Sequence, residues 1–129
     1  MATYLFSVPL LPGKTETWKN YMKEVNGPRN EEYRKSRKKN GVQVEQVSLQ
    51  HTPDGDVVVA RIDTDNINRV FEYYMKSKEP FDVWFREKIL METHGMEPTG
   101  ELPKIEKLIF DYQETGTREY VGAKGNRNT

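Results

Sequence analysis

The chain has 129 residues, with 20 basic and 20 acidic side chains and no cysteine. This length suits one domain with a single core. The formal net charge of zero leaves no overall field that would favour nucleic acid or an anionic membrane, and the lack of cysteine excludes disulfides and thiolate metal sites. Apolar residues make up only 35% of the chain, which favours an oligomer that shares a core.

The apolar run near the N-terminus is not typical of an export signal. Tyr4 to Leu11 has no basic segment before it and no small-residue cleavage pattern after it. No run approaches the ~20 apolar residues that a membrane-spanning helix needs. We therefore expect a soluble, cytoplasmic protein without a membrane partner.

The first segments predict a strand followed by a helix. Residues Thr3 to Leu10 are rich in aromatic and branched side chains and precede Pro12 and Gly13, which is typical of a strand and a turn. From Thr15 the apolar residues recur at helical spacing, which predicts an amphipathic helix packed on a sheet. These residues are Trp18, Tyr21, Met22 and Val25.

A basic stretch follows Gly27 and Pro28 and ends at Asn40 and Gly41. We expect a solvated helix here, because acidic residues precede the basic ones and no aromatic side chains follow them as a stacking platform for nucleic acid. The basic residues are Arg34, Lys35, Arg37, Lys38 and Lys39. The sequence therefore predicts no nucleic-acid partner.

Two alternating apolar stretches predict a β-hairpin. Val42 and Val44 have one parity, whereas Val47 and Leu49 have the other, so the strand should change faces near Glu45 and Gln46 through a β-bulge. The turn Thr52-Pro53-Asp54-Gly55 then connects to a strand from Asp56 to Ile62. A connection this short makes the two strands antiparallel.

The remaining elements are a helix pair and a last strand. Helical spacing recurs at Ile67, Val70, Phe71 and Tyr74, and a further helix follows Pro80 and ends at Gly95. One predicted face of that helix carries Phe81, Trp84, Phe85 and Lys88, and the adjacent face carries Val83, Glu87, Leu90 and His94. Lys104 to Tyr112 predicts a strand. The residues from Gln113 onward read as a polar tail, in which Tyr120 and Val121 would dock on a partner subunit if the tail is ordered.

This order of elements predicts a fold class. Strand, helix, two strands, helix pair and strand make a β-α-β-β-α-β, ferredoxin-like α+β fold, with an antiparallel sheet and helices on one face. Residues 1–112 form the predicted domain, and residues 113–129 form the tail. The other face of such a sheet is bare, and a second copy of the chain is the simplest cover for it.

The segment PFDVWFREKILMETHG, from Pro80 to Gly95, resembles a helix in the dimeric α+β barrel superfamily. The likeness covers about residues 3 to 112 and is nearest to small bacterial members of unassigned function. The resemblance implies a homodimer in which two ferredoxin-like sheets meet to form a barrel. The segment from Pro80 to Gly95 carries no catalytic motif.

Two enzymatic branches of that superfamily offer comparisons. Haem-degrading monooxygenases place a tryptophan and a haem-ligating histidine ten positions apart, as Trp84 and His94 are here. They also use an asparagine in the first strand, which Tyr4 to Val8 lacks. Polyketide cyclases and cofactor-free quinone-forming monooxygenases bind aromatic polyketides between sheet and helices, with a histidine or tyrosine as acid or base.

A few residues are candidates for chemistry. His94 lies near a predicted helix C-terminus, where the helix dipole would raise its pKa; it could be a general base or a ligand, or it could cap the helix. Arg86 could hold a carboxylate or enolate, or it could form a structural ion pair. The ligand-binding candidates are Trp84, Tyr74, Phe85 and Tyr4. Packing in the core is the alternative role of these aromatic residues.

Metal and nucleotide motifs are absent from the sequence. It has no HxH, HExxH, DxDxDG or phosphate-loop pattern, so we expect no metal and no cofactor, with haem as the one exception to test. Three hypotheses remain: a homodimer that binds a small apolar or aromatic molecule between sheet and helices, a small-molecule enzyme that uses His94, or a structural or regulatory dimer without a ligand.

Overall fold

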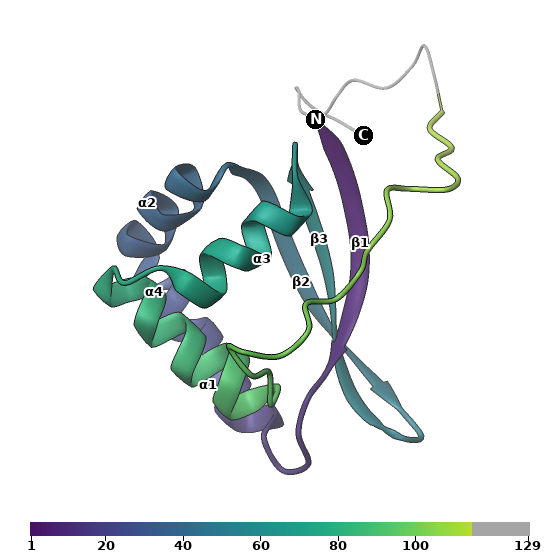
Figure 1. The fold of residues 1–129 in the computed structure, drawn as a ribbon. Helices are drawn as coiled ribbons and strands as arrows, with labels where there is room; N and C mark the ends of the chain where they lie inside the picture. The colour runs from purple at the N-terminus through teal and green to yellow at the C-terminus, as the bar shows by residue number, and fades with distance from the viewer. Residues whose placement is uncertain (115–129) are drawn as a thin grey trace.

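The computed structural model describes residues 1–114, which form an α+β fold with all helices on one side of a three-stranded antiparallel sheet (Figure 1). Strands β1 (Ala2–Pro9) and β2 (Val42–Thr52) flank the central β3 (Gly55–Thr64). The predicted fold class, α+β with an antiparallel sheet, is confirmed. The hairpin of β2 and β3 is also present as predicted.

The register of the sheet divides its side chains between two faces. Tyr4 lies opposite Ile62, and Val8 lies opposite Val58. Because strand residues alternate, the same face of β1 and β3 carries every second residue. These residues face the helices: Tyr4, Phe6, Val8, Val58, Ala60 and Ile62. The opposite face carries more exposed side chains, among them Leu5, whose exposed fraction is 55%.

A β-bulge in β2 lies earlier than the sequence predicts. The register shifts between Val42 and Val44, and not near Gln46. Two residues of β2 therefore oppose one residue of β3, and the parity of every later residue changes. As a result Glu45 lies opposite Ile62, on the face that the helices cover.

Five helical segments pack over the sheet. They are α1 (Thr15–Asn26), α2 (Asn30–Asn40), α3 (Ile67–Lys76), α4 (Pro80–Trp84) and the π-helix η1 (Phe85–Thr93). The apolar stripe predicted for α3 is buried, whereas that of α1 is buried at Trp18 and Val25 and half-buried at Tyr21 and Met22. Among the described residues, no helix combines the length and apolar character that spanning a bilayer requires.

The predicted strand from Lys104 to Tyr112 is wrong. In the described residues this segment pairs with the sheet only through a single bridge between Tyr4 and Lys107. A strand is stabilised by packing of its side chains, but Ile109 and Phe110 are 93% and 82% exposed, so they pack little against residues 1–114. The tail residues Tyr120 and Val121 lie outside the described residues.

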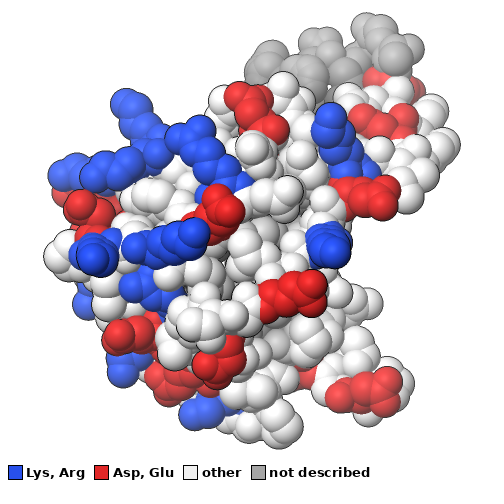
Figure 2. Space-filling view, in the orientation of Figure 1, with Lys and Arg blue, Asp and Glu red and all other residues white. Residues whose placement is uncertain are grey.

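The basic helix α2 also differs from its prediction. Most of its lysines and arginines are solvated, and acidic side chains lie among the basic ones on the helical side of the molecule (Figure 2). Arg37, however, is only 4% exposed. Its charge points into the protein and is part of the site described next.

Candidate ligand-binding site

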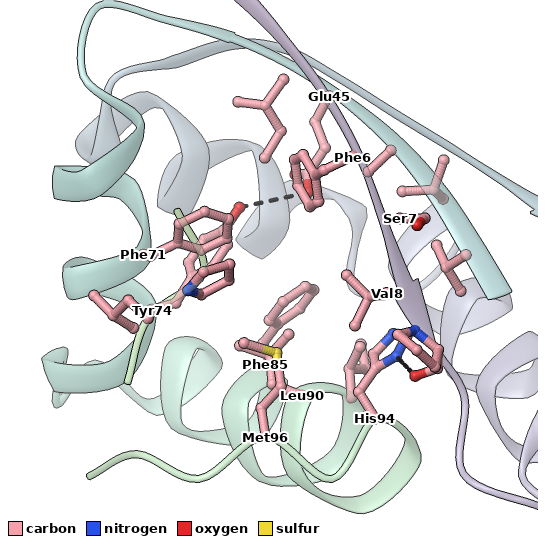
Figure 3. A pocket seen from close by; sticks show the side chains of 18 of the residues that line it. Phe6, Ser7, Val8, Glu45, Phe71, Tyr74, Phe85, Leu90, His94 and Met96 are labelled. Carbon is pink, nitrogen blue, oxygen red and sulfur yellow. Dashed lines mark hydrogen bonds between the residues drawn. The ribbon is translucent and has the colours of Figure 1, made fainter. Parts of the chain in front are cut away.

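A cavity of about 1150 Å³ lies between the helix-facing side of the sheet and the helices (Figure 3). Residues 96–105, after η1, contribute to one wall. The walls are mostly apolar. They include Phe6, Val8, Trp18, Met22, Val58, Ala60, Phe71, Tyr74, Phe85, Leu90, Met96 and Leu102.

A buried carboxylate forms a polar spot in this apolar wall. Glu45 Oε1 accepts hydrogen bonds from the Tyr33 hydroxyl at 2.6 Å and from Arg37 Nε at 2.7 Å. Glu45 Oε2 accepts a longer bond of 3.4 Å from the Tyr74 hydroxyl (Figure 3). Glu45, Tyr33 and Tyr74 all line the cavity. We call Arg37, Glu45, Tyr33 and Tyr74 the buried carboxylate cluster.

Aromatic rings hold the arginine of this cluster in place. The Arg37 guanidinium carbon lies 4.6 Å from the ring centres of both Tyr33 and Tyr74, and 4.4 Å from that of Phe85. Such cation–π contacts are strongest when the cation is shielded from water. One buried nitrogen, Arg37 Nη2, has no hydrogen-bond partner among the described residues.

The cluster keeps its carboxylate ionised. Burial by itself would raise the pKa of Glu45, but the adjacent Arg37 charge and the hydrogen bonds from Arg37 and Tyr33 lower it below its ordinary value. Burial, together with the Glu45 charge, raises the pKa of Tyr74 well above its ordinary value. At neutral pH the site therefore presents a carboxylate that accepts hydrogen bonds and tyrosine hydroxyls that donate them.

Sequence reasoning missed this cluster because the buried stripe of α2 is polar. The inward-facing residues are Tyr33, Ser36, Arg37 and Asn40. They follow the i, i+3, i+4, i+7 spacing of a helix that packs on a core. Hydrophobic periodicity cannot reveal such a stripe. The available signal was the i, i+4 spacing of Tyr33 and Arg37, which places a cation beside an aromatic ring.

His94 lies at another part of the cavity wall, just after η1. It is half-buried, and its Nδ1 donates a hydrogen bond of 2.8 Å to the Pro9 carbonyl oxygen. Burial lowers the pKa of His94 and outweighs the Pro9 bond, which acts in the opposite direction. The predicted rise in the pKa of His94 is therefore wrong, because burial lowers this pKa more than the Pro9 bond raises it.

The π-helix explains how His94 reaches the cavity. In an α-helix, Phe85 and His94 would be rotated by about 180° from each other, since each residue advances about 100°. A π-helix has about 4.4 residues per turn, which brings positions nine apart within roughly 20°. Both side chains consequently line the same cavity. The predicted division of this helix into two α-helical faces is therefore wrong from Phe85 onward.

The other predicted site residues occupy different places. Tyr74 and Phe85 line the cavity. Tyr4 is buried in the core and borders a separate, smaller cleft of about 460 Å³. Arg86 donates from Nη1 to the carbonyl oxygens of Tyr74, at 2.8 Å, and Ser77, at 3.0 Å, which places its charge at the C-terminus of α3.

Trp84 does not line the cavity that His94 lines. Its ring lies 4.2 Å from the Arg29 guanidinium and 5.8 Å, edge to face, from the Tyr21 ring. The tryptophan and histidine that suggest a haem-degrading enzyme are therefore not assembled around one space. The residues present do not fit that haem site. In the described part of the chain, no three potential metal ligands lie together.

Comparisons with known proteins extend this description. None of the curated proteins compared with the chain matches it. A solved structure of tetracenomycin F2 cyclase from Streptomyces glaucescens, a type-II polyketide cyclase, is similar over 90% of this chain and 99% of that chain, with 15% sequence identity and a TM-score of 0.49. A family model described as a family of unknown function (DUF6176) matches residues 1–98. The chain therefore belongs to this family.

Proposed function

We propose that this protein binds a small, largely apolar or aromatic molecule in the cavity between its sheet and its helices. The observation that carries the proposal is a space of about 1150 Å³ with mainly apolar walls and a few polar groups. Sites for small molecules are typically about 300–1000 Å³ and combine apolar walls with a small number of placed polar groups. The cavity has walls of this kind, and its volume is slightly above this range.

Trp18 provides a direct test because it lines the cavity, whereas Trp84 does not. In a Trp84→Phe variant, Trp18 is the only tryptophan. We expect the neutral probe N-phenyl-1-naphthylamine to gain fluorescence on binding and to quench Trp18 by energy transfer. The matched variant Trp18→Phe should retain the fluorescence gain of the probe, because a phenyl ring keeps this part of the wall apolar. A probe that remains dark in the wild-type protein overturns the proposal.

A cavity-filling variant locates the probe. Ala60 is 7% exposed and lines the cavity from β3. Ala60→Phe adds a ring to that space and should weaken probe binding about tenfold or more. Asn20→Phe is the control, because Asn20 is exposed on α1 and does not line the cavity. Circular dichroism checks that both variants are folded. Equal loss of binding in the two variants would contradict this location.

His94 favours a second candidate function, an enzyme that removes a proton from an aromatic substrate. Its Nδ1 donates to Pro9, so in the neutral ring Nε2 carries the free lone pair of a general base. Solvent deuterium exchange at the acidic carbon of anthrone, followed by NMR, tests this function. The wild-type protein should accelerate exchange and His94→Gln should not. Equal rates for both proteins would reject catalysis by His94.

We infer further that the chain assembles as a homodimer of the α+β barrel type. The support is the sheet face opposite the helices, where Leu5 is 55% exposed, together with the exposed apolar side chains of residues 108–112. Exposed apolar patches of this kind mark contact surfaces. Light scattering at micromolar concentration should give twice the mass of the chain, and a monomeric mass would overturn the assembly.

A further inference from the structure

We propose that Glu45 is the polar recognition point of the cavity and that it selects ligands with a neutral hydroxyl donor, with phenols as the best representatives. This inference rests on the proposed function, since it names the ligand class of the same cavity. It starts from the position of one carboxylate. Glu45 lines the cavity, and its side chain is 14% exposed.

The two oxygens of this carboxylate differ in their hydrogen bonding. Oε1 accepts two short bonds, from Tyr33 at 2.6 Å and Arg37 at 2.7 Å. Among the described residues, Oε2 accepts only the 3.4 Å bond from Tyr74. An ionised carboxylate offers about four acceptor positions, and a bond of 3.4 Å is near the limit of useful length. Oε2 therefore has room for one more donor.

The surroundings favour a neutral donor over a charged ligand. A carboxylate ligand would meet the negative charge of Glu45 and would bring no hydrogen to donate. A cationic ligand would gain little from Glu45, because Arg37 already balances the charge of this carboxylate. The Arg37 guanidinium also lies against the Tyr74 and Phe85 rings. A neutral hydroxyl needs only the free acceptor position. Tyr33 and Tyr74 show that phenol hydroxyls suit this carboxylate as donors.

The apolar walls determine the rest of the ligand. Phe71, Tyr74 and Phe85 lie around the same part of the cavity as Glu45 (Figure 3). Their rings form an edge-to-face pair at 6.1 Å and a tilted pair at 5.7 Å. A flat aromatic ring that carries its hydroxyl at one edge would contact these side chains while the hydroxyl reaches Oε2. Phenolic aromatic molecules combine both features.

The test compares three ligands of nearly the same shape in competition with N-phenyl-1-naphthylamine at pH 7.5. We expect 2-naphthol to displace the probe at a concentration about tenfold or more below that of naphthalene, since a hydrogen bond to a buried carboxylate is among the stronger ones. We expect 2-naphthoate to be no better than naphthalene. If 2-naphthol displaces the probe no better than naphthalene, or no better than 2-naphthoate, this inference is overturned. The proposed function stands in either case. Failure of the probe and of naphthalene to bind overturns the proposed function itself.

Two variants assign the effect to Glu45. Glu45→Gln should remove most of the preference for 2-naphthol over naphthalene. Because that change leaves Arg37 without its charge partner and could prevent folding, Tyr74→Phe provides an independent measurement. It removes the competing hydroxyl and keeps the carboxylate, so the preference for 2-naphthol should stay the same or increase. A preference lost in Tyr74→Phe, or retained in a folded Glu45→Gln protein, overturns the assignment.

Discussion

At the scale of single residues, Arg37 and Glu45 depend on each other. Their side chains are 5% and 14% exposed and their charged atoms are 2.7 Å apart. Removing one partner of a buried ion pair leaves the other as an uncompensated buried charge. Replacing both by apolar residues of similar size avoids that cost, so single and double variants should behave very differently.

We therefore predict that Glu45→Ala lowers the free energy of unfolding by about 3–5 kcal/mol. The double variant Arg37→Met with Glu45→Leu should recover most of this loss. Urea unfolding followed by circular dichroism measures both. Lys39→Met is the control, because its pair with Glu79 is 60% exposed on both sides and should contribute less than about 1 kcal/mol. A double variant as unstable as Glu45→Ala would contradict this account.

His94 predicts how stability depends on pH. Its pKa in the folded protein is lowered by burial, so between that value and the ordinary value of about 6.5 the unfolded chain binds more protons. The free energy of unfolding should therefore decrease as the pH falls below about 6.5. His94→Gln should remove this part of the decrease. Denaturant titrations of both proteins from pH 8 to pH 5 test the effect, and parallel curves would exclude it.

Sequence reasoning found His94 but not its environment. Its candidacy came from residue type and position, which are visible in the sequence, whereas its pKa depends on burial in the fold and on a hydrogen bond to Pro9, 85 residues away. For Glu45, the sequence indicated only that it is one of the two residues near which a β-bulge was expected. Its role depends on Arg37 and Tyr33 from α2 and on Tyr74 from α3, which lie beside β2 only in the folded chain.

At the scale of elements, η1 is the segment whose geometry matters most for the site. Pro80 starts the helix, as its sequence predicts, and the backbone becomes π-helical at Phe85. Its buried residues follow the wider turn: Phe85, Ile89, Leu90 and Thr93. A π-helical segment is equivalent to an α-helix with an inserted residue and is common at functional sites. No residue type marks it, which is why an apolar pattern of period 3.6 could not reveal it.

We predict that deletion of Lys88, an exposed residue of η1, restores α-helical geometry and places His94 about 80° around the helix from Phe85 instead of roughly 20°, which turns its ring towards the edge of the cavity. The pKa of His94, measured by NMR, should then rise towards its ordinary value of about 6.5. Lys88→Ala removes the same side chain and keeps the length of the helix, so it should leave this pKa low. An unchanged pKa in the deletion variant would show that η1 does not position His94.

At the scale of the whole molecule, the two faces of the sheet have different roles. The helices and residues 96–105 enclose the space on one side. On the other side, the described residues provide no covering helix (Figure 1), and this face carries half-buried Val57 and Val59 as well as exposed Leu5. The sequence predicted the bare face correctly from the order of the elements. It did not predict that residues 104–112 leave the sheet, because alternation alone does not supply a surface to pack against.

We predict that Leu5→Asp weakens the proposed dimer, because it places a charge in the centre of an apolar contact. Its mass by light scattering should approach that of one chain at concentrations at which the wild-type protein is dimeric. Leu11→Asp is the control, since Leu11 is also exposed, at 40%, but lies in the loop after β1. Binding of the naphthylamine probe by the Leu5→Asp monomer would show that one chain suffices for the cavity.

The bulge between Val42 and Val44 has a consequence for how this family can change over time. It lets Val42 and Glu45, which are an odd number of positions apart, both lie on the face that the helices cover, because the extra residue at a bulge reverses the parity of those that follow. Loss of one residue between Val42 and Glu45 would remove the bulge and leave Val42 opposite Thr64 and Glu45 opposite Ile62, so the carboxylate would still face the helices. The spacing from Gly41 to the first acidic residue of β2 can therefore differ by one residue among relatives without reversing the face on which that carboxylate lies.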